Sequence, residues 1–201
     1  MCIDRFFRSF GRLWPLFSLV AATFVPTSNG ATCTTASQLT AAQRDVLTGA
    51  AQSMMGQVRN GDIEGLRAGT IPAVAANFSG IASSAEALKP ALQQATLTVD
   101  HIYVLDATQD QAGGSGVQFF CTPGSSSMTV VLNFSDLPAG KYAVAILHAT
   151  GVAKPQQISL ILNETGANQW KLAGFFVKPM TMAGHDGVWY WEQARNYSQK
   201  K

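Results

Sequence analysis

The sequence predicts an α+β domain, in which N-terminal helices pack on a bent, mainly antiparallel six-stranded sheet and a short C-terminal helix follows. Two observations support this fold class. Between residues 37 and 94, apolar residues recur every three or four positions, which is typical of amphipathic helices. Between residues 96 and 179 the apolar period falls to two, and turn residues separate the runs. Helices followed by hairpin-connected strands indicate helices on one face of an antiparallel sheet.

Residues 1–30 have the layout of a secretory signal peptide, with a basic start, an apolar run at 13–25 and a small polar end. A run of thirteen residues that is interrupted by Pro15 is too short to span a hydrocarbon core of about 30 Å. We therefore expect cleavage close to Ala31 and no stable membrane span afterwards. The mature protein is expected to be secreted or periplasmic.

The rest of the chain divides into a linker at 31–37, an α+β domain at 38–179 and a C-terminal aromatic helix or tail at 180–201. Residues 1–30 contain three of the 14 Lys and Arg residues and one of the 12 Asp and Glu residues, so 11 of each sign remain. Because nucleic-acid binding needs a concentrated basic surface, no nucleic-acid partner is expected. An apolar fraction of 47% with 13% charged residues predicts a folded core.

The first helix is expected over residues 37–59. Its apolar stripe consists of Leu39, Ala42, Val46, Ala50, Met54 and Val58. Gly49 and Gly56 each weaken a helix, so we expect another backbone to approach them closely in compensation. A capping-box pattern precedes a shorter helix expected over 84–94.

Six strands follow. They are expected at 96–105, 117–122, 128–134, 141–150, 156–164 and 169–178. In the first of them, strict alternation places Leu97, Val99, His101, Tyr103 and Leu105 on one face. The glycine-rich stretch before the second strand is interpreted as a hairpin loop, since it leads into a strand and lacks the Lys and Ser or Thr of a phosphate-binding loop.

The last strand, 169–178, is apolar on both faces and therefore needs cover on both sides. The N-terminal helices can cover one face. The other could be covered by a C-terminal helix at 187–199 or by another subunit, and the second alternative would make the protein a homodimer.

The C-terminal helix carries an aromatic stripe. Its members are Tyr190, Trp191, Ala194 and Tyr197. We expect this helix to pack on its own domain, with Trp191 buried and Arg195 in solvent. The alternative is that Trp189, Tyr190 and Trp191 bind a partner protein, because Trp and Tyr dominate interface hot spots.

Cysteine content agrees with export. Cys2 would leave with the signal peptide, so Cys33 and Cys121 remain as one pair. An oxidising compartment and the lack of a competing thiol predict a disulfide between them, which would attach the polar N-terminal segment to the sheet. The alternative is two unrelated cysteines, with Cys33 free or lipid-modified.

The order of a long helix, short helices, a long strand and a bent meander resembles the NTF2-like superfamily, whose members are cystatin-like α+β cones. The closing hairpin at 163–177, where a polar turn and Trp170-Lys171 precede an apolar strand, is the most similar part. The likeness covers residues 38–178 and is greatest to secreted bacterial members of unassigned function. That superfamily includes dehydratases, isomerases, transport adaptors and non-catalytic modules, so the resemblance implies a fold without choosing a function.

The resemblance implies that an enzyme of this type would hold a carboxylate or a His–Asp pair inside the cone between helices and sheet. The candidates are Asp100, His101, Tyr103, Asp106 and His148. His148, at a strand end, could act as an acid or a base near neutral pH, or could simply be half-exposed and bonded to a loop. Asp100 is not expected to pair with His101, because the side chains of adjacent residues on a strand point to opposite faces of the sheet.

No metal and no cofactor are expected. His185 and Asp186 could be half of a metal site, but a metal ion needs three or four converging ligands. Asp186 is better explained as the N-cap of the C-terminal helix, with His185 in the preceding turn.

We expect an exported, non-catalytic domain that binds a small apolar ligand or a partner protein in the cell envelope. Tyr103, Tyr142 and His148 would line the ligand site. One alternative is a cofactor-free enzyme of the isomerase or dehydratase type that uses His148 or His101 with Asp106. A second is an envelope assembly subunit that docks through its C-terminal aromatic helix. Apolar side chains filling the cone would count against catalysis.

Overall fold

A computed structural model of the chain describes residues 31–108, 116–122 and 128–200, so the expected signal peptide lies outside the described residues. The fold is α+β, as predicted. Within the described residues the elements are β1 (Thr32–Thr35), α1 (Ala41–Asn60), α2 (Ile63–Ala68), α3 (Pro72–Ala75), α4 (Ser79–Leu92), β2 (Thr96–Asp106), β3 (Val117–Cys121), β4 (Val130–Phe134), β5 (Lys141–Thr150), β6 (Gln156–Gly166), β7 (Gln169–Pro179) and α5 (Gly187–Gln199).

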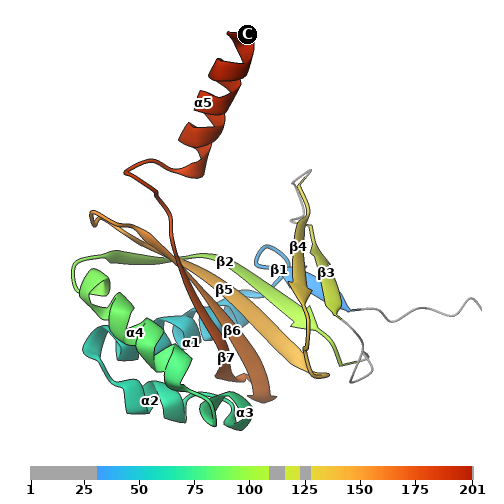
Figure 1. Cartoon of the computed structure of the whole chain (residues 1–201). Coiled ribbons are helices and arrows are strands. Elements are labelled where there is room, and N and C mark those ends of the chain that lie inside the picture. The colour runs from blue at the N-terminus through green and yellow to red at the C-terminus, as the bar shows by residue number, and fades with distance from the viewer. Residues whose placement is uncertain (1–30, 109–115, 123–127, 201) are drawn as a thin grey trace, which may run out of the picture.

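Helices α1 to α4 form a layer on one face of the main sheet (Figure 1). Helix α1 begins with a capping box, in which the Gln43 backbone N–H donates to Thr40 Oγ1 and the Thr40 N–H donates to Gln43 Oε1. It ends at Gly61, whose φ of 75° is a left-handed conformation that glycine adopts without steric cost. The buried side of α1 is turned slightly from the predicted stripe and consists of Leu47, Ala51, Met54, Met55 and Val58.

The main sheet has five strands in the order β1-β2-β5-β6-β7, and every neighbouring pair is antiparallel. The expectation of six strands in one sheet is therefore wrong in two respects. Strands β3 and β4 form a separate two-stranded ribbon, and part of the segment expected to be a linker forms the edge strand β1. Strand β1 lies antiparallel to β2, from Thr32 opposite Asp106 to Thr35 opposite Tyr103.

A β-bulge interrupts β2. Val99 pairs with Leu147 and His101 with Ile146, so Asp100 is an extra residue without its own partner on β5. The bulge changes which side chains face the helices, because an extra residue shifts the alternation by one.

The predicted common face of β2 is therefore wrong. Leu97 and Val99 pack against the helices, whereas Tyr103 and Leu105 belong to a cluster on the opposite face. His101 lies on that opposite face beside Tyr103, with 6.0 Å between the ring centroids, so the prediction that these two share a face is confirmed.

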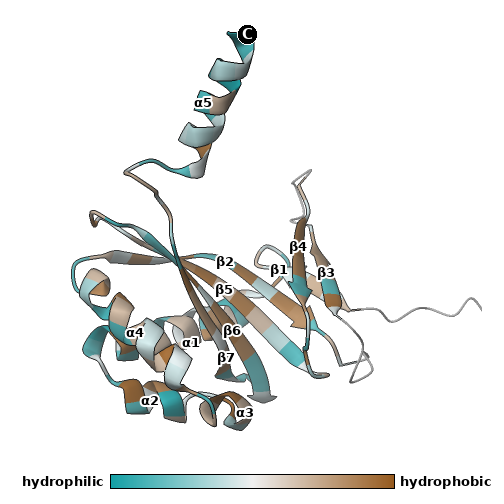
Figure 2. Cartoon of the chain, in the orientation of Figure 1, coloured by the Kyte–Doolittle hydropathy of each residue, from teal (hydrophilic) through white to brown (hydrophobic). Residues whose placement is uncertain are grey.

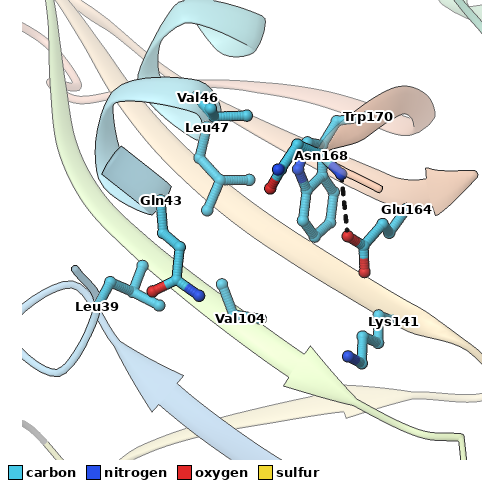
Figure 3. A pocket seen from close by; sticks show the side chains of 9 residues that line it. All are labelled: Leu39, Gln43, Val46, Leu47, Val104, Lys141, Glu164, Asn168 and Trp170. Carbon is cyan, nitrogen blue, oxygen red and sulfur yellow. Dashed lines mark hydrogen bonds between the residues drawn. The ribbon is translucent and has the colours of Figure 1, made fainter. Parts of the chain in front are cut away.

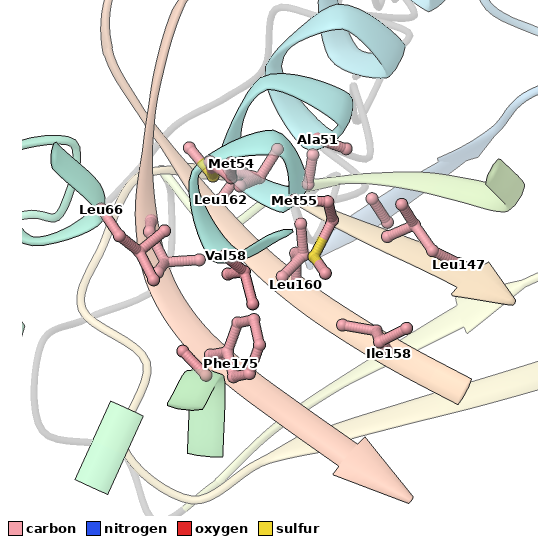
Figure 4. Packing of buried hydrophobic residues seen from close by; sticks show 14 of the residues in the cluster. Ala51, Met54, Met55, Val58, Leu66, Leu147, Ile158, Leu160, Leu162 and Phe175 are labelled. Atoms are coloured by element: carbon pink, nitrogen blue, oxygen red, sulfur yellow. The ribbon is translucent and has the colours of Figure 1, made fainter. Parts of the chain in front are cut away.

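The first hydrophobic core fills the space between the helices and the sheet. Figure 4 shows side chains of α1 and α2 meeting those of β5, β6 and β7. Met55, Leu66, Leu160 and Leu172 are almost completely buried there. In β7 the register shifts at Ala173, so that Leu172 and Phe175 both face this core.

A second, smaller core lies on the other face of the sheet, beneath the β3–β4 ribbon. Phe119 and Cys121 of the ribbon pack with Tyr103, Leu105 and further residues of the sheet. Figure 2 shows hydrophobic colouring along the ribbon and β5, in agreement with this packing. This second core extends across β5 to Ile161 of β6, whereas Phe176 of β7 is 60% exposed.

The predicted disulfide is confirmed. Cys33 of β1 and Cys121 of β3 are bonded, with 5.2 Å between their Cα atoms and 88 residues between them in sequence. The bond joins the edge of the main sheet to the ribbon that covers it, so it ties together two pieces that are separate in the hydrogen-bonding pattern.

Helix α5 stands clear of the rest of the molecule (Figure 1). None of its residues is buried. The prediction that it packs on its own sheet, with Trp191 in the core, is therefore wrong: Trp191 is 58% exposed. Arg195 is exposed, as predicted, and its guanidinium lies over the Trp191 ring, 4.6 Å from the centroid.

Candidate functional site

Two surfaces are functional candidates: a polar cluster on the open face of the sheet, and helix α5. In the polar cluster, His101 Nε2 lies 3.0 Å and His148 Nδ1 lies 3.9 Å from Asp100 Oδ2. The bulge brings this about, because residues at a bulge do not alternate as ordinary strand residues do. The prediction that Asp100 cannot reach His101 is therefore wrong.

A spacing in the sequence could have revealed this arrangement. The residues of β2 that face the helices are Leu97, Val99, Ile102 and Val104. These four residues are successively two, three and two positions apart. A single step of three within an alternation of two is the pattern that one inserted residue produces. The signal is hidden because Tyr103 and Leu105, on the other face, are equally apolar.

The polar cluster is open to solvent. The side chains of His101, Asp100 and His148 are 56%, 41% and 24% exposed. A carboxylate can orient an imidazole, but water surrounds this pair on the outside of the sheet, and an active site gains most from groups that water does not reach. The enzyme hypothesis requires a His–Asp pair enclosed between the helices and the sheet, and this pair does not lie there.

Asp106 is not part of this cluster. It lies at the far end of β2, opposite Lys141, whereas His148 lies opposite Thr98 at the other end of the same strand pair. Thr108 donates two hydrogen bonds to Asp106 Oδ1, from its hydroxyl at 2.6 Å and from its backbone N–H at 3.0 Å. These bonds, the hydroxyl's above all, lower the pKa of Asp106 below its ordinary value. The structure does not bring Asp106 together with either histidine.

The expected ligand-binding tyrosines are packed into the second core. Tyr103 is 5% and Tyr142 is 4% exposed, and the Tyr142 hydroxyl donates to the Pro138 carbonyl at 2.9 Å. Burial raises the pKa of both phenols, and the charge of Asp100 adds to the rise for Tyr103. The structure brings Tyr103 near His101 but leaves neither tyrosine open to a ligand beside His148.

A small cavity remains at the mouth of the helix–sheet interface (Figure 3). Its volume is about 110 Å³, well below the roughly 300 Å³ at which ordinary ligand pockets begin. It is lined by Leu39, Gln43, Val46, Leu47, Val104, Lys141, Glu164, Asn168 and Trp170. None of the predicted site residues lines it. This cavity therefore offers little room for a small apolar ligand.

Neither a metal site nor a membrane-spanning helix is found in the described residues. Among residues 31–108, 116–122 and 128–200, no three His, Cys, Asp or Glu side chains are grouped so that they could hold a metal ion. In that part of the chain, no helix combines the length and the apolar character needed to cross a bilayer.

The second candidate surface is the aromatic stripe of α5. Tyr190, Trp191 and Tyr197 are 40%, 58% and 69% exposed. Tyr190 and Tyr197 are almost two full turns apart, and Trp191 follows about 100° further around the helix, so the three lie on one side. Such a group of exposed aromatic side chains is unusual for a surface without a binding role.

Several contacts hold the turn before α5 to the start of the helix. Asp186 caps the helix, as predicted, by accepting a hydrogen bond of 2.9 Å from the Trp189 N–H. His185 stacks on the Trp189 ring at a centroid distance of 3.7 Å, which also confirms its predicted place in the turn. Trp189 is thus engaged within the turn, and so is Tyr190, whose hydroxyl donates to the Met182 carbonyl at 2.8 Å; Trp191 and Tyr197 remain the most exposed members of the stripe.

Comparisons with known proteins identify no relative: no family model matches the chain, and no curated protein and no solved structure matches it.

Proposed function

We propose that this protein is an exported, non-catalytic binding domain of the NTF2-like type, which attaches to a partner protein in the cell envelope through helix α5. The observation that carries the proposal is the exposure of Tyr190, Trp191 and Tyr197 on a helix with no buried residue. An isolated helix of 13 residues is marginal in water, so an exposed α5 gains most of its stability from a contact outside its own domain.

Three further observations support binding at the surface over catalysis in a cone. Apolar side chains fill the space between helices and sheet. The polar cluster around Asp100 faces solvent on the other side of the sheet. The cavity nearest the cone mouth is too small for an ordinary ligand. Export is supported by the signal-peptide pattern and by the Cys33–Cys121 disulfide.

Photo-crosslinking in the native cell envelope tests this function. A photoreactive amino acid replaces Tyr197 on α5, and in a matched control variant it replaces Phe120, which is 62% exposed on the outer face of the ribbon. We expect discrete protein adducts from position 197 and none from position 120. Equal labelling at both positions, or no adduct from position 197, would contradict the proposal.

A further inference from the structure

Two opposite charges stand where the first core opens to solvent. On β5, every second residue from 143 to 149 belongs to this core, so Lys141 lies on the same face at the start of the row. On β6, Leu162 belongs to the core and Glu164 is the next residue on its face. A lysine and a glutamate therefore end two otherwise apolar rows that lie beside each other in the sheet.

These two charged side chains do not pair with each other. Tyr142 and Asn163 are partners across β5 and β6, so Lys141 and Glu164 are neighbours one step further along the strands. Opposite charges in such positions commonly attract each other. In the described part of the chain, however, the ion pairs join Asp100 to histidines, and none joins Lys141 to Glu164. Both side chains instead line the cavity of about 110 Å³ (Figure 3).

The turn between β6 and β7 holds the Glu164 carboxylate at the wall of this cavity. The Asn168 N–H donates to Glu164 Oε1 at 3.4 Å. Asn168 has a φ of 58°, a left-handed conformation that asparagine adopts more readily than most residues. Within the described residues this is the one hydrogen bond that the carboxylate accepts, so most of its capacity as an acceptor remains unused.

Gln43 supplies a donor from the first turn of α1. Its Oε1 accepts hydrogen bonds of 3.0 Å from both the Thr40 N–H and the Thr40 hydroxyl. Because the oxygen is fixed in this way, Nε2 faces the other side, and Figure 3 shows it directed towards Val104, which also lines the cavity. A carboxylate, an ammonium group and an amide donor therefore surround the same space, each from a different element.

The rest of the wall is apolar, and the space is small. The apolar lining residues are Leu39, Val46, Leu47, Val104 and Trp170. A cavity of about 150 Å³ takes up a molecule of the size of benzene. The volume of about 110 Å³ therefore suits a ligand of about five or six non-hydrogen atoms, smaller than ordinary ligands.

We propose that this cavity binds a small zwitterionic α-amino acid of about the size of alanine. The ammonium group contacts Glu164, the carboxylate contacts Lys141 and Gln43, and the methyl group packs on the apolar wall. A simple amine would leave Lys141 without a partner in the cavity and a simple acid would leave Glu164 without one, whereas a zwitterion satisfies both charges. The site shares no residue with α5, so the inference goes beyond the proposed function and does not depend on it.

Asp106 does not take the place of the ligand's carboxylate. It lies opposite Lys141 on β2, but its Oδ1 accepts both hydrogen bonds from Thr108. It is not among the residues that line the cavity. The ammonium group of Lys141 therefore stays available to a ligand in the cavity.

NMR titration of the isotope-labelled chain, with its disulfide intact, tests the site. We expect alanine, as at least one of its enantiomers, to shift the Gln43 side-chain amide and Trp170 indole signals saturably, with a dissociation constant on the order of 1 mM. In isobutyrate a methyl group replaces the ammonium group, and in isopropylamine a methyl group replaces the carboxylate. Each of these probes should bind about tenfold more weakly than alanine or worse, because each leaves one charge of the site without its partner.

Variants that remove one charge identify the two contacts. Glu164→Gln should weaken alanine binding about tenfold and leave isobutyrate binding unchanged, whereas Lys141→Gln should weaken alanine binding similarly and leave isopropylamine binding unchanged. A variant that merely disturbed the cavity would weaken the binding of every probe. Glu86→Gln and Lys154→Gln are the matched controls, since both residues are exposed and lie outside the cavity, and they should leave alanine binding unchanged.

The inference is overturned if neither enantiomer of alanine produces a saturable shift. It is also overturned if isobutyrate or isopropylamine binds as tightly as alanine, or if Glu164→Gln binds alanine like the wild type. None of these results bears on the binding role of α5, which photo-crosslinking at position 197 tests separately.

Discussion

Asp100 and His101 lie on the same side of the sheet because of one extra residue in β2. In a regular strand, neighbouring side chains face opposite ways, so one of these two would face the helices. With the bulge, the Asp100 carboxylate lies 3.0 Å from His101 Nε2 and both side chains stay in contact with solvent. Both are thereby kept out of the apolar core, where an unpaired charge would be strongly destabilising.

The pKa of Asp106 provides a test at the residue scale. Thr108→Val removes the hydroxyl that donates to Asp106 and keeps the side-chain shape. We expect the pKa of Asp106 to rise part of the way towards its ordinary value, because the backbone hydrogen bond from residue 108 remains. Carboxyl-carbon NMR titration measures the change, and Thr108→Ser, which keeps the hydroxyl, is the control.

The sign of the stability effect follows from the lowered pKa. Because the folded-state pKa of Asp106 lies below the unfolded value of about 3.9, the stabilisation is complete above about pH 4 to 5 and is lost as the pH falls through the folded pKa. In Thr108→Val this acid-dependent part of the unfolding free energy should shrink. An unchanged pKa in the variant would contradict the assignment to Thr108.

At the scale of elements, the two glycines of α1 lie in open surroundings, whereas the sequence predicted that another backbone packs against them. No atom lies within 4 Å of a Cβ built on Gly49 or Gly56, so the expected close approach of another backbone is wrong. These glycines reduce the stability of α1 without a packing contact in return. That helix is instead held by its capping box and by the apolar contacts of its buried face.

Gly49→Ala should therefore stabilise the protein. We expect the free energy of unfolding to rise by about 0.5–1 kcal/mol, since alanine restricts the unfolded chain and favours the helix. Denaturant titration measures the change. Gly61→Ala is the contrasting variant, because φ at Gly61 is 75°, a left-handed conformation that is strained for alanine. It should lower stability, and a rise in both variants would contradict the explanation.

At the scale of the whole molecule, two cores on opposite faces share one sheet. The helices enclose the first core, and the β3–β4 ribbon encloses the second. Within the described residues the ribbon makes no strand pairing with the main sheet, so its attachment depends on side-chain packing and on the Cys33–Cys121 bond.

Removing the disulfide should lower stability substantially. The bond closes a loop of 88 residues, and the chain-entropy model gives about 4–5 kcal/mol for a loop of that size. We expect the Cys33→Ala, Cys121→Ala double variant to lose up to about this amount in denaturant titration, with the ribbon losing amide protection first. The reduced wild type should behave like the double variant. Equal unfolding midpoints for oxidised and reduced protein would contradict a structural role.

Export makes a prediction about the length of the mature chain. Protein recovered from the extracytoplasmic fraction of its native host should have an intact mass that corresponds to a start at or near Ala31. It should also have no titratable thiol under denaturing, non-reducing conditions, since Cys2 would be removed and the other two cysteines are bonded. A mass that includes residues 1–30 would contradict export with cleavage.

Local patterns in the sequence determined the α+β class, the strands β5 to β7, the cap at Asp186 and the Cys33–Cys121 pair. Each of these depends on short-range chemistry: an apolar period, a turn residue, a side chain that satisfies nearby N–H groups, or the absence of a competing thiol. Strand β5 begins and ends where its alternation predicts.

Only the tertiary structure decided the register of β2, the separation of the ribbon from the sheet and the position of α5. A single bulge reverses the faces of a strand, and both faces of β2 are apolar, so alternation alone could not locate it. Likewise, an aromatic stripe shows that a helix has an apolar face but not which surface meets it. The structure shows α5 standing clear of the sheet that it was expected to cover, with its first residues held by contacts to the preceding turn.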